Sequence, residues 1–243
     1  FVNLSVSDFC MDADGQMWMS TSQGLFVYNG QYLTSFNLPE VSPRDLSCYH
    51  VDINSRGDVY VAGSGGLFVL PFGQDYTKRV IDHMVLSVKA IGNQIFYGDK
   101  EGLHFLDEKG NSKLLYRCTL EDISVRCIRI EGDKVWFTAS RRLGCFDMKT
   151  KKVNLYYVSS TSSLTDFSVF KDKIYLGTKS DGLLVFDIYS KRQNKVASVL
   201  GRIIISPEQT FFISYIVMSL LIIIDYATMV AYHHLWECKI FML

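Results

Sequence analysis

The stretch DADGQMWMSTSQGLFVYNG, residues 12–30, sets two turns around two short apolar strands. Asp14-Gly15 forms the first turn and Gln23-Gly24 the second, because glycine readily takes the positive φ that tight hairpins need. The segments QMWMST and LFVY are rich in the aromatic and apolar residues that favour strands. Aspartates, glycines and a tryptophan also occur together in sugar and metal sites. Copies of the stretch elsewhere in the chain decide whether it is a site or a building block.

The pattern recurs along most of the chain. The aromatic residue of the second strand is Trp18 in the first copy, and at spacings of 42, 36, 40 and 39 residues it is followed by Tyr60, Phe96, Trp136 and Tyr175. Each copy contains an apolar run, a polar turn, the aromatic strand, a turn that usually ends in Gly-Leu, and two further strands. Four short strands at such a period, without a helical pattern, are typical of a β-propeller blade. Blades cover their apolar faces by stacking, so these aromatic residues are expected to pack between neighbours.

We therefore predict an all-β fold, a β-propeller of about five four-stranded blades, followed by an apolar C-terminal helix. The propeller region covers residues 1–200, with repeats at about 4–40, 44–82, 84–118, 122–158 and 163–197. Many propellers close with more blades than this, so we expect an incomplete ring with exposed blade edges, from a fragment or a truncated gene product.

The composition changes after Gly201, where turn glycines end and an apolar tail, residues 203–243, begins. A bilayer core takes about twenty apolar residues in a helix, so residues 211–232 are predicted to be a transmembrane helix. Asp225 lies inside this range, but the many Ile, Leu, Phe and Val residues around it offset the cost of one carboxylate. A buried apolar helix or a misordered tail is the alternative.

Composition argues against several classes of protein. Lysines plus arginines equal aspartates plus glutamates at 25 each, so no net charge points to a nucleic acid. The six cysteines lack paired metal spacing, and buried thiols are favoured over disulfides. No metal and no cofactor is predicted. Asp12 and Asp14 lack the later acidic residues of a calcium loop and are interpreted as turn residues.

No catalytic motif is recognisable from spacing. His50, His83 and His104 fall in separate repeats, and nothing links them to a serine or to paired carboxylates. We therefore predict that the chain is not an enzyme. Arg141 and Arg142 replace turn residues of the repeat and are weak candidates for binding, since a guanidinium suits an acidic sugar or a phosphate. The alternative is a solvated turn in a degenerate copy.

The pattern D-x-x-G-x-[LMV]-[WY]-x-x-[TS]-x-x-G-L occurs in DADGQMWMSTSQGL and loosely in GDVYVAGSGGL and KIYLGTKSDGL. It resembles the two-component regulator propeller repeat. In that family the repeats form the extracytoplasmic sensor of hybrid histidine kinases, many of them in Bacteroidetes and tied to polysaccharide breakdown products.

The resemblance implies a sensor module of a two-component system in the periplasm, which recognises an oligosaccharide. The sequence contains neither a phospho-accepting histidine box nor a nucleotide-binding glycine pattern, so we expect the chain to lack its own kinase domain. It also implies a single-pass anchor in the inner membrane through the C-terminal helix. A homodimer is a further expectation. The alternatives are a propeller-fold hydrolase or lyase, or a protein-interaction scaffold.

Overall fold

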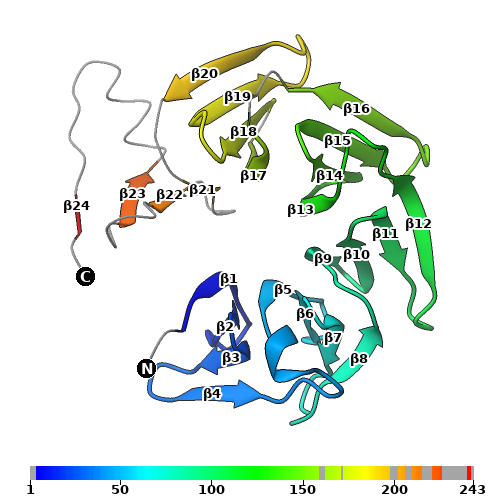
Figure 1. Cartoon of the computed structure of the whole chain (residues 1–243), viewed down its shortest axis with the longest axis vertical. Helices are drawn as coiled ribbons and strands as arrows, with labels where there is room; N and C mark the ends of the chain where they lie inside the picture. Colours follow the sequence, from blue (N-terminus) through cyan, green and yellow to red (C-terminus); the bar gives the residue numbers. More distant parts are fainter. Residues whose placement is uncertain are drawn as a thin grey trace. The chain divides into compact units, whose positions relative to one another are not determined.

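The computed structural model describes residues 4–158, 162–170 and 172–197, and the strand segments 202–205, 210–214, 221–225 and 240–241. The chain divides into two compact units, residues 1–130 and 131–243. Both are built from four-stranded antiparallel sheets whose strands follow one another in sequence (Figure 1). The predicted all-β fold with four-stranded propeller blades is confirmed.

The first unit contains three blades. Blade 1 consists of β1 (Val6–Met11), β2 (Met17–Thr21), β3 (Gly24–Tyr28) and β4 (Leu33–Phe36). A short 3₁₀ helix, η1 (Pro43–Asp45), precedes blade 2, which consists of β5 (Cys48–Ile53), β6 (Val59–Gly63), β7 (Gly66–Leu70) and β8 (Lys78–Ile81). Blade 3 consists of β9 (Ser87–Ile91), β10 (Gln94–Gly98), β11 (Gly102–Leu106) and β12 (Ser112–Arg117).

The second unit continues the same pattern. Blade 4 consists of β13 (Val125–Glu131), which begins in the first unit, and of β14 (Lys134–Ala139), β15 (Arg142–Asp147) and β16 (Val153–Tyr157). Blade 5 consists of β17 (Leu164–Phe170), β18 (Lys173–Thr178), β19 (Leu183–Asp187) and β20 (Gln193–Ala197).

The C-terminal tail differs from the prediction. Its described segments form a further sheet of β21 (Arg202–Ile205), β22 (Thr210–Ser214), β23 (Leu221–Asp225) and β24 (Ile240–Phe241). The helix predicted over residues 211–232 is therefore wrong at β22 and β23, and the rest of that range lies outside the described residues. Runs of isoleucine, at 203–205 and 222–224, explain the difference, because β-branched side chains favour extended backbone. None of the helical segments in the described part of the chain has the length and apolar character that crossing a membrane requires.

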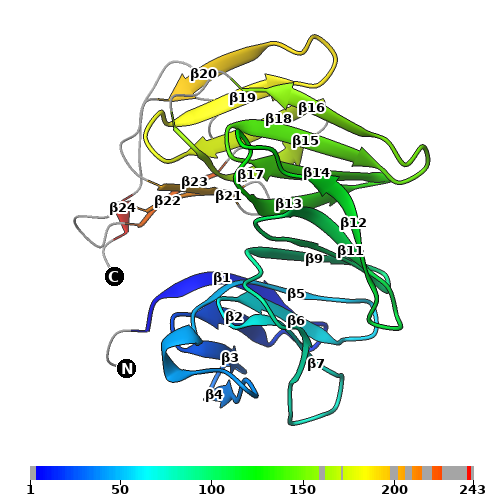
Figure 2. The same cartoon turned by 45° about the vertical axis from the view of Figure 1, so that its right-hand side comes forward.

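Neighbouring blades of the first unit meet along their first strands, β1 against β5 and β5 against β9 (Figure 1, Figure 2). Carboxylate side chains link these first strands by hydrogen bonds and ion pairs. Asp8 of β1 accepts a hydrogen bond from the Val51 N–H of β5 at 3.3 Å. One blade further on, Asp52 of β5 accepts from the Ala90 N–H of β9 at 2.7 Å. Each carboxylate also pairs with a side chain of the next blade, which is His50 at 3.1 Å for the first and Lys89 at 2.9 Å for the second.

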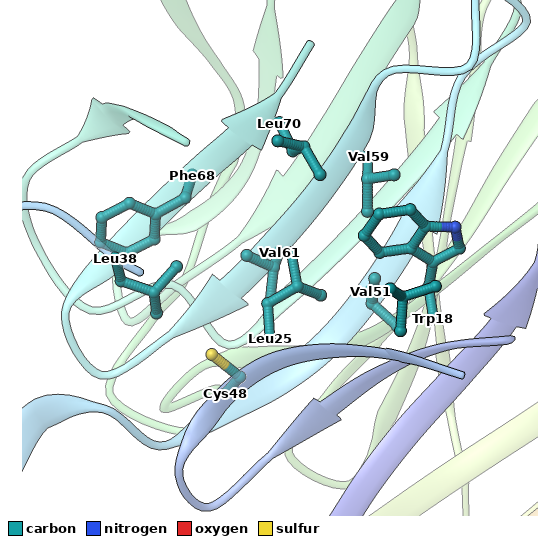
Figure 3. Close-up of a cluster of buried hydrophobic side chains, with 10 residues drawn as sticks. Trp18, Leu25, Leu38, Cys48, Val51, Val59, Val61, Phe68 and Leu70 are labelled. Atoms are coloured by element: carbon teal, nitrogen blue, oxygen red, sulfur yellow. The ribbon is translucent and has the colours of Figure 1, made fainter. Parts of the chain in front are cut away.

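Blades 1 and 2 enclose an apolar core. Trp18 of β2 lies in this core with valines of blade 2, and its indole N–H donates to Asp12 at 2.9 Å. The predicted packing of this residue between blades is confirmed. Nearer the outer strands, Leu38 and Phe68 are 4% and 1% exposed and lie side by side (Figure 3). We call this pair the apolar junction.

Candidate functional site

A cavity of about 620 Å³ lies in the first unit, where the β8 strand and the linker after it meet β10, β11 and β12. Its lining is mostly polar. The acidic side chains are Glu40, Asp82, Asp99 and Glu101, the basic or titratable ones are Arg79, His83 and His104, the hydroxyls are Tyr97 and Ser112, and the apolar ones are Val80, Ile81 and Leu114.

Asp99 lies at the centre of this lining and is 1% exposed. It belongs to the hairpin between β10 and β11, where its Oδ1 accepts from the backbone N–H of Glu101 at 2.7 Å and of Gly102 at 2.9 Å. The same oxygen lies 3.0 Å from His104 Nε2, and Oδ2 lies 3.0 Å from His83 Nε2. One carboxylate therefore joins the hairpin to the linker between β8 and β9.

A glycine is required in this hairpin. Gly102 has a φ of +154°, and a Cβ atom there would lie 1.7 Å from the Tyr116 carbonyl oxygen of β12. Any larger residue would push β12 away from β11. Ser112 lies at the other end of this strand pair, opposite Leu106.

Burial by itself raises the pKa of the Asp99 carboxyl, because it removes the charge from water. Hydrogen bonds from His104 and the Gly102 N–H, the charge interaction with His104 and the hydrogen bond from His83 outweigh that effect and lower the pKa to about 2. Asp99 is thus ionised at neutral pH. It accepts hydrogen bonds and does not donate them.

A chain of hydrogen bonds runs from this carboxylate to the edge of blade 3. Because the ionised Asp99 only accepts, Nε2 of His104 donates to it, and in the tautomer with its single proton at Nε2 the other ring nitrogen, Nδ1, is an acceptor. The Ser112 hydroxyl lies 3.5 Å from that Nδ1 and 2.6 Å from the Tyr97 hydroxyl. The Tyr97 and His104 rings stack, with centroids 4.6 Å apart and planes 4° apart. We call His83, Asp99 and His104 the polar junction.

The repeat pattern shows how unusual this arrangement is within the molecule. Three residues after the aromatic of the second strand, blades 1 and 5 have Thr21 and Thr178, whose hydroxyls donate within their own hairpins to the Gly24 and Gly182 carbonyls, both at 2.8 Å. Blade 3 has Asp99 at this position. A carboxylate that also binds two imidazoles thus replaces a hydroxyl that closes a turn.

The two imidazoles also differ from the side chains at the equivalent positions of other blades, which are apolar. His104 follows Gly-Leu as Phe68 does in blade 2. His83 lies two residues after Ile81, which pairs with Leu67, just as Leu38 lies two residues after Phe36. The polar junction therefore occupies, between blades 2 and 3, the place that the apolar junction occupies between blades 1 and 2.

Ser112, together with His104 and Asp99 of the polar junction, forms a serine–histidine–aspartate series of the kind that hydrolases use. The Ser112 hydroxyl is closer to the tyrosine than to the histidine. Within the described residues, no group of three or more His, Cys, Asp or Glu side chains is arranged to hold a metal ion.

The structure separates the histidines that the sequence left unlinked. His83 and His104 meet on one carboxylate, whereas His50 lies in β5 beside Asp8. The sequence signal for the site is the set of exceptions to the repeat at His83, Asp99 and His104, whereas the exceptions predicted to bind are Arg141 and Arg142.

Those two arginines lie in the β14–β15 hairpin of the second unit. Arg141 is exposed and accepts at its carbonyl from the Val158 N–H at 3.4 Å, while Arg142 is half-buried at the start of β15. Neither lines the cavity. Their role in binding stays a prediction.

The first repeat matches a known family. The model of the two component regulator propeller matches residues 1–23. These residues carry a two component regulator propeller repeat. The resemblance found in DADGQMWMSTSQGL is thereby confirmed, and the other blades of the chain are structural copies of the same four-stranded unit. No curated protein matches the chain.

Solved propeller structures resemble the chain in fold. One is the extracellular domain of a protein described as a hybrid two component system of B. thetaiotaomicron, with a TM-score of 0.71 and 16% identity over 94% of this chain and 34% of that one. Another is the extracellular domain of a protein described as a one component system of the same organism, with a TM-score of 0.72 and 17% identity over 93% of this chain and 33% of that one. This chain thus spans about a third of the length of both.

An enzyme shares the fold as well. A streptogramin B lyase structure has a TM-score of 0.68 and 12% identity over 84% of this chain and 74% of that one. At these identities the likeness concerns the fold, which sensors and enzymes share.

Proposed function

We propose that the chain is the ligand-binding propeller module of an extracytoplasmic two-component sensor, and that it binds an oligosaccharide in the cavity at the polar junction. The observation that carries the proposal is the cavity itself. It lies where His83 and His104 stand at the positions of the apolar Leu38 and Phe68, and Asp99 at the position of a threonine. The equivalent place between blades 1 and 2 is filled by the buried Leu38 and Phe68, whereas a cavity with a mostly polar lining lies here.

The lining suits a polyhydroxyl ligand. The hydroxyls of Tyr97 and Ser112 can both donate and accept, while the carboxylates of Glu40 and Glu101 accept. Leu114 and the β8 side chains offer apolar surface to the carbon face of a sugar ring. Ordered hydrogen-bonding groups beside apolar patches are the general form of a small-molecule site.

The family match in the first repeat and the extracellular sensor domains among the similar structures support the placement outside the cytoplasm. In this proposal the module itself performs no catalysis, and binding is passed on by other parts of a signalling system. Attachment to a membrane and homodimer formation stay predictions. Fractionation of the cells in which the chain naturally occurs, with an antibody against it, would test the location.

Isothermal titration calorimetry tests the binding proposal. The full chain is titrated with a panel of plant and host oligosaccharides, and at least one is expected to bind with heat that saturates. Ser112→Ala removes a lining hydroxyl and is expected to weaken that binding. Ser190→Ala, in the exposed turn before β20, is the matched control and is expected to leave it unchanged. The absence of saturable heat across the whole panel would contradict the proposal.

A hydrolase is the second candidate, favoured by the chain from Ser112 through His104 to Asp99. In that case the Ser112 hydroxyl would act as a nucleophile, with His104 as its base. A fluorophosphonate probe separates the two candidates. Covalent labelling of the full chain that is lost in Ser112→Ala would support the hydrolase, whereas no labelling would leave binding as the function.

A further inference from the structure

We infer that the oligosaccharide bound at the polar junction is acidic, and that Arg79 binds its carboxylate. The inference rests on the proposed function and names the ligand class for the same cavity. It follows from a guanidinium on the β8 wall of the cavity that has no counterion in the described part of the chain.

Arg79 is half-buried and lines the cavity. Its Nη2 donates to the Asp82 carbonyl at 2.7 Å, while its Nε is buried and has no hydrogen-bond partner among the described residues. The side chain passes over the β6–β7 hairpin, where a Cβ on Gly66 would come within 3.3 Å of Nε. The buried Nε faces this hairpin, so the charge of the guanidinium and the remaining N–H groups of its Nη atoms are what Arg79 offers to a ligand.

The carboxylates of the cavity are engaged or lie in water. Asp99 already accepts four hydrogen bonds. Glu101 is 65% exposed and lies 3.8 Å from Arg117, and the Asp82 side chain is 91% exposed. Two unit charges at a given distance interact several times more strongly near a protein surface than in water. The half-buried Arg79 therefore acts more strongly on a bound anion than the exposed carboxylates do, and the charge of the buried Asp99 is compensated by the two imidazoles and two backbone N–H groups that bind it.

A carboxylate on a sugar fits the guanidinium for a geometric reason. Guanidinium groups are planar and match carboxylates through two parallel hydrogen bonds. The remaining sugar hydroxyls then face the carboxylate of Glu40 and the hydroxyls of Tyr97 and Ser112. One acidic group among several hydroxyls is the composition of a uronic-acid oligosaccharide.

The test compares galacturonate and glucuronate oligosaccharides with their methyl esters by calorimetry on the full chain. The acids are expected to bind about tenfold or more tighter than the esters, since hydrogen bonds to charged groups contribute about 1.5–3 kcal/mol. Arg79→Gln is expected to remove this preference while the ester still binds, which also shows that the variant is folded. Lys78→Gln makes the same change of charge on an exposed neighbour and is expected to keep the preference.

A further variant tests whether removing a negative charge from the cavity raises the affinity for an acidic oligosaccharide. Glu40→Gln removes a negative charge from the cavity and is expected to raise the affinity for the acids. Because changes in the contact with the sugar hydroxyls affect acids and esters alike, the ratio of acid to ester affinity is the measure, and a fall in that ratio would contradict an acidic ligand.

The outcomes separate the two proposals. Equal binding of acids and esters, or a preference that survives in Arg79→Gln, would overturn the inference and leave the oligosaccharide-binding function in place. Failure of acids, esters and neutral oligosaccharides to bind would overturn both.

Discussion

The apolar junction and the polar junction occupy the same place in successive blades, yet they differ in every property that matters for binding. Leu38 and Phe68 fill the first and are almost fully buried. His83 and His104 replace them in the second, where Asp99 holds both imidazoles and a cavity of about 620 Å³ is present. The comparison shows how a repeat can change one position from packing to recognition without changing the course of its strands.

The largest effect on stability is expected at the apolar junction. Phe68→Ala should lower the free energy of unfolding by about 3–5 kcal/mol, because it removes a buried ring and leaves a cavity. Urea denaturation followed by circular dichroism measures the change. His104→Ala, at the equivalent position of blade 3, is expected to cost less. An equal or larger loss for His104→Ala would show that the polar junction, too, is chiefly a packing site.

Asp99→Asn is expected to cost about 1.5–3 kcal/mol, the range for hydrogen bonds to a charged group. The uncharged amide accepts more weakly from the two imidazoles and from the hairpin N–H groups. The same denaturation measurement checks it. Asp107→Asn, in the exposed β11–β12 turn, is the control and should cost less. Equal effects of the two substitutions would contradict a central role for Asp99.

The cost of Asp99→Asn should depend on pH. The pKa of Asp99 is lowered to about 2 in the folded protein, below the value of about 4 of an unfolded carboxyl. Its contribution is therefore complete above about pH 4 and is lost as the pH falls towards 2. The difference in unfolding free energy between the parent chain and Asp99→Asn should shrink from pH 6 to pH 2.5. A difference that stays constant would contradict the ionised carboxylate.

The smallest effect is expected at the rim of the cavity. Arg117 and Glu101 lie 3.8 Å apart and their side chains are 70% and 65% exposed. Arg117→Gln should change the unfolding free energy by less than about 0.5 kcal/mol, because water and salt screen such a pair. A loss above 1 kcal/mol would show that the rim is more tightly coupled to the polar junction than its exposure indicates.

The blades could be predicted from sequence because their signals are local and repeated. Turn glycines, the Gly-Leu step and the aromatic at Trp18 and Tyr60 recur at a nearly constant period, and stacking then follows from burial. The tail could not be read in the same way. Apolar runs without turn signals fit either a helix or strands. The length of the apolar segment favours a helix, whereas its β-branched isoleucines favour strands.

The site was harder to predict because its residues meet across blades. Asp99 and His104 are close in sequence, but His83 reaches them from the linker after β8. Such an encounter depends on the stacking of blades and leaves no spacing pattern. The available signal is a histidine and an aspartate at repeat positions that are otherwise apolar or small, and it is less conspicuous in the sequence than the paired Arg141 and Arg142.

The most direct test rebuilds the polar junction as its repeat counterparts. Asp99→Thr combined with His104→Phe places in blade 3 the residues found in blades 1 and 2, Thr21 and Phe68. Calorimetry on this folded variant should show oligosaccharide affinity at least about thirtyfold below that of the parent, the equivalent of about 2 kcal/mol. Leu38→Met at the apolar junction should retain the parent affinity. Undiminished binding by the rebuilt variant would contradict the assignment of the polar junction as the ligand site.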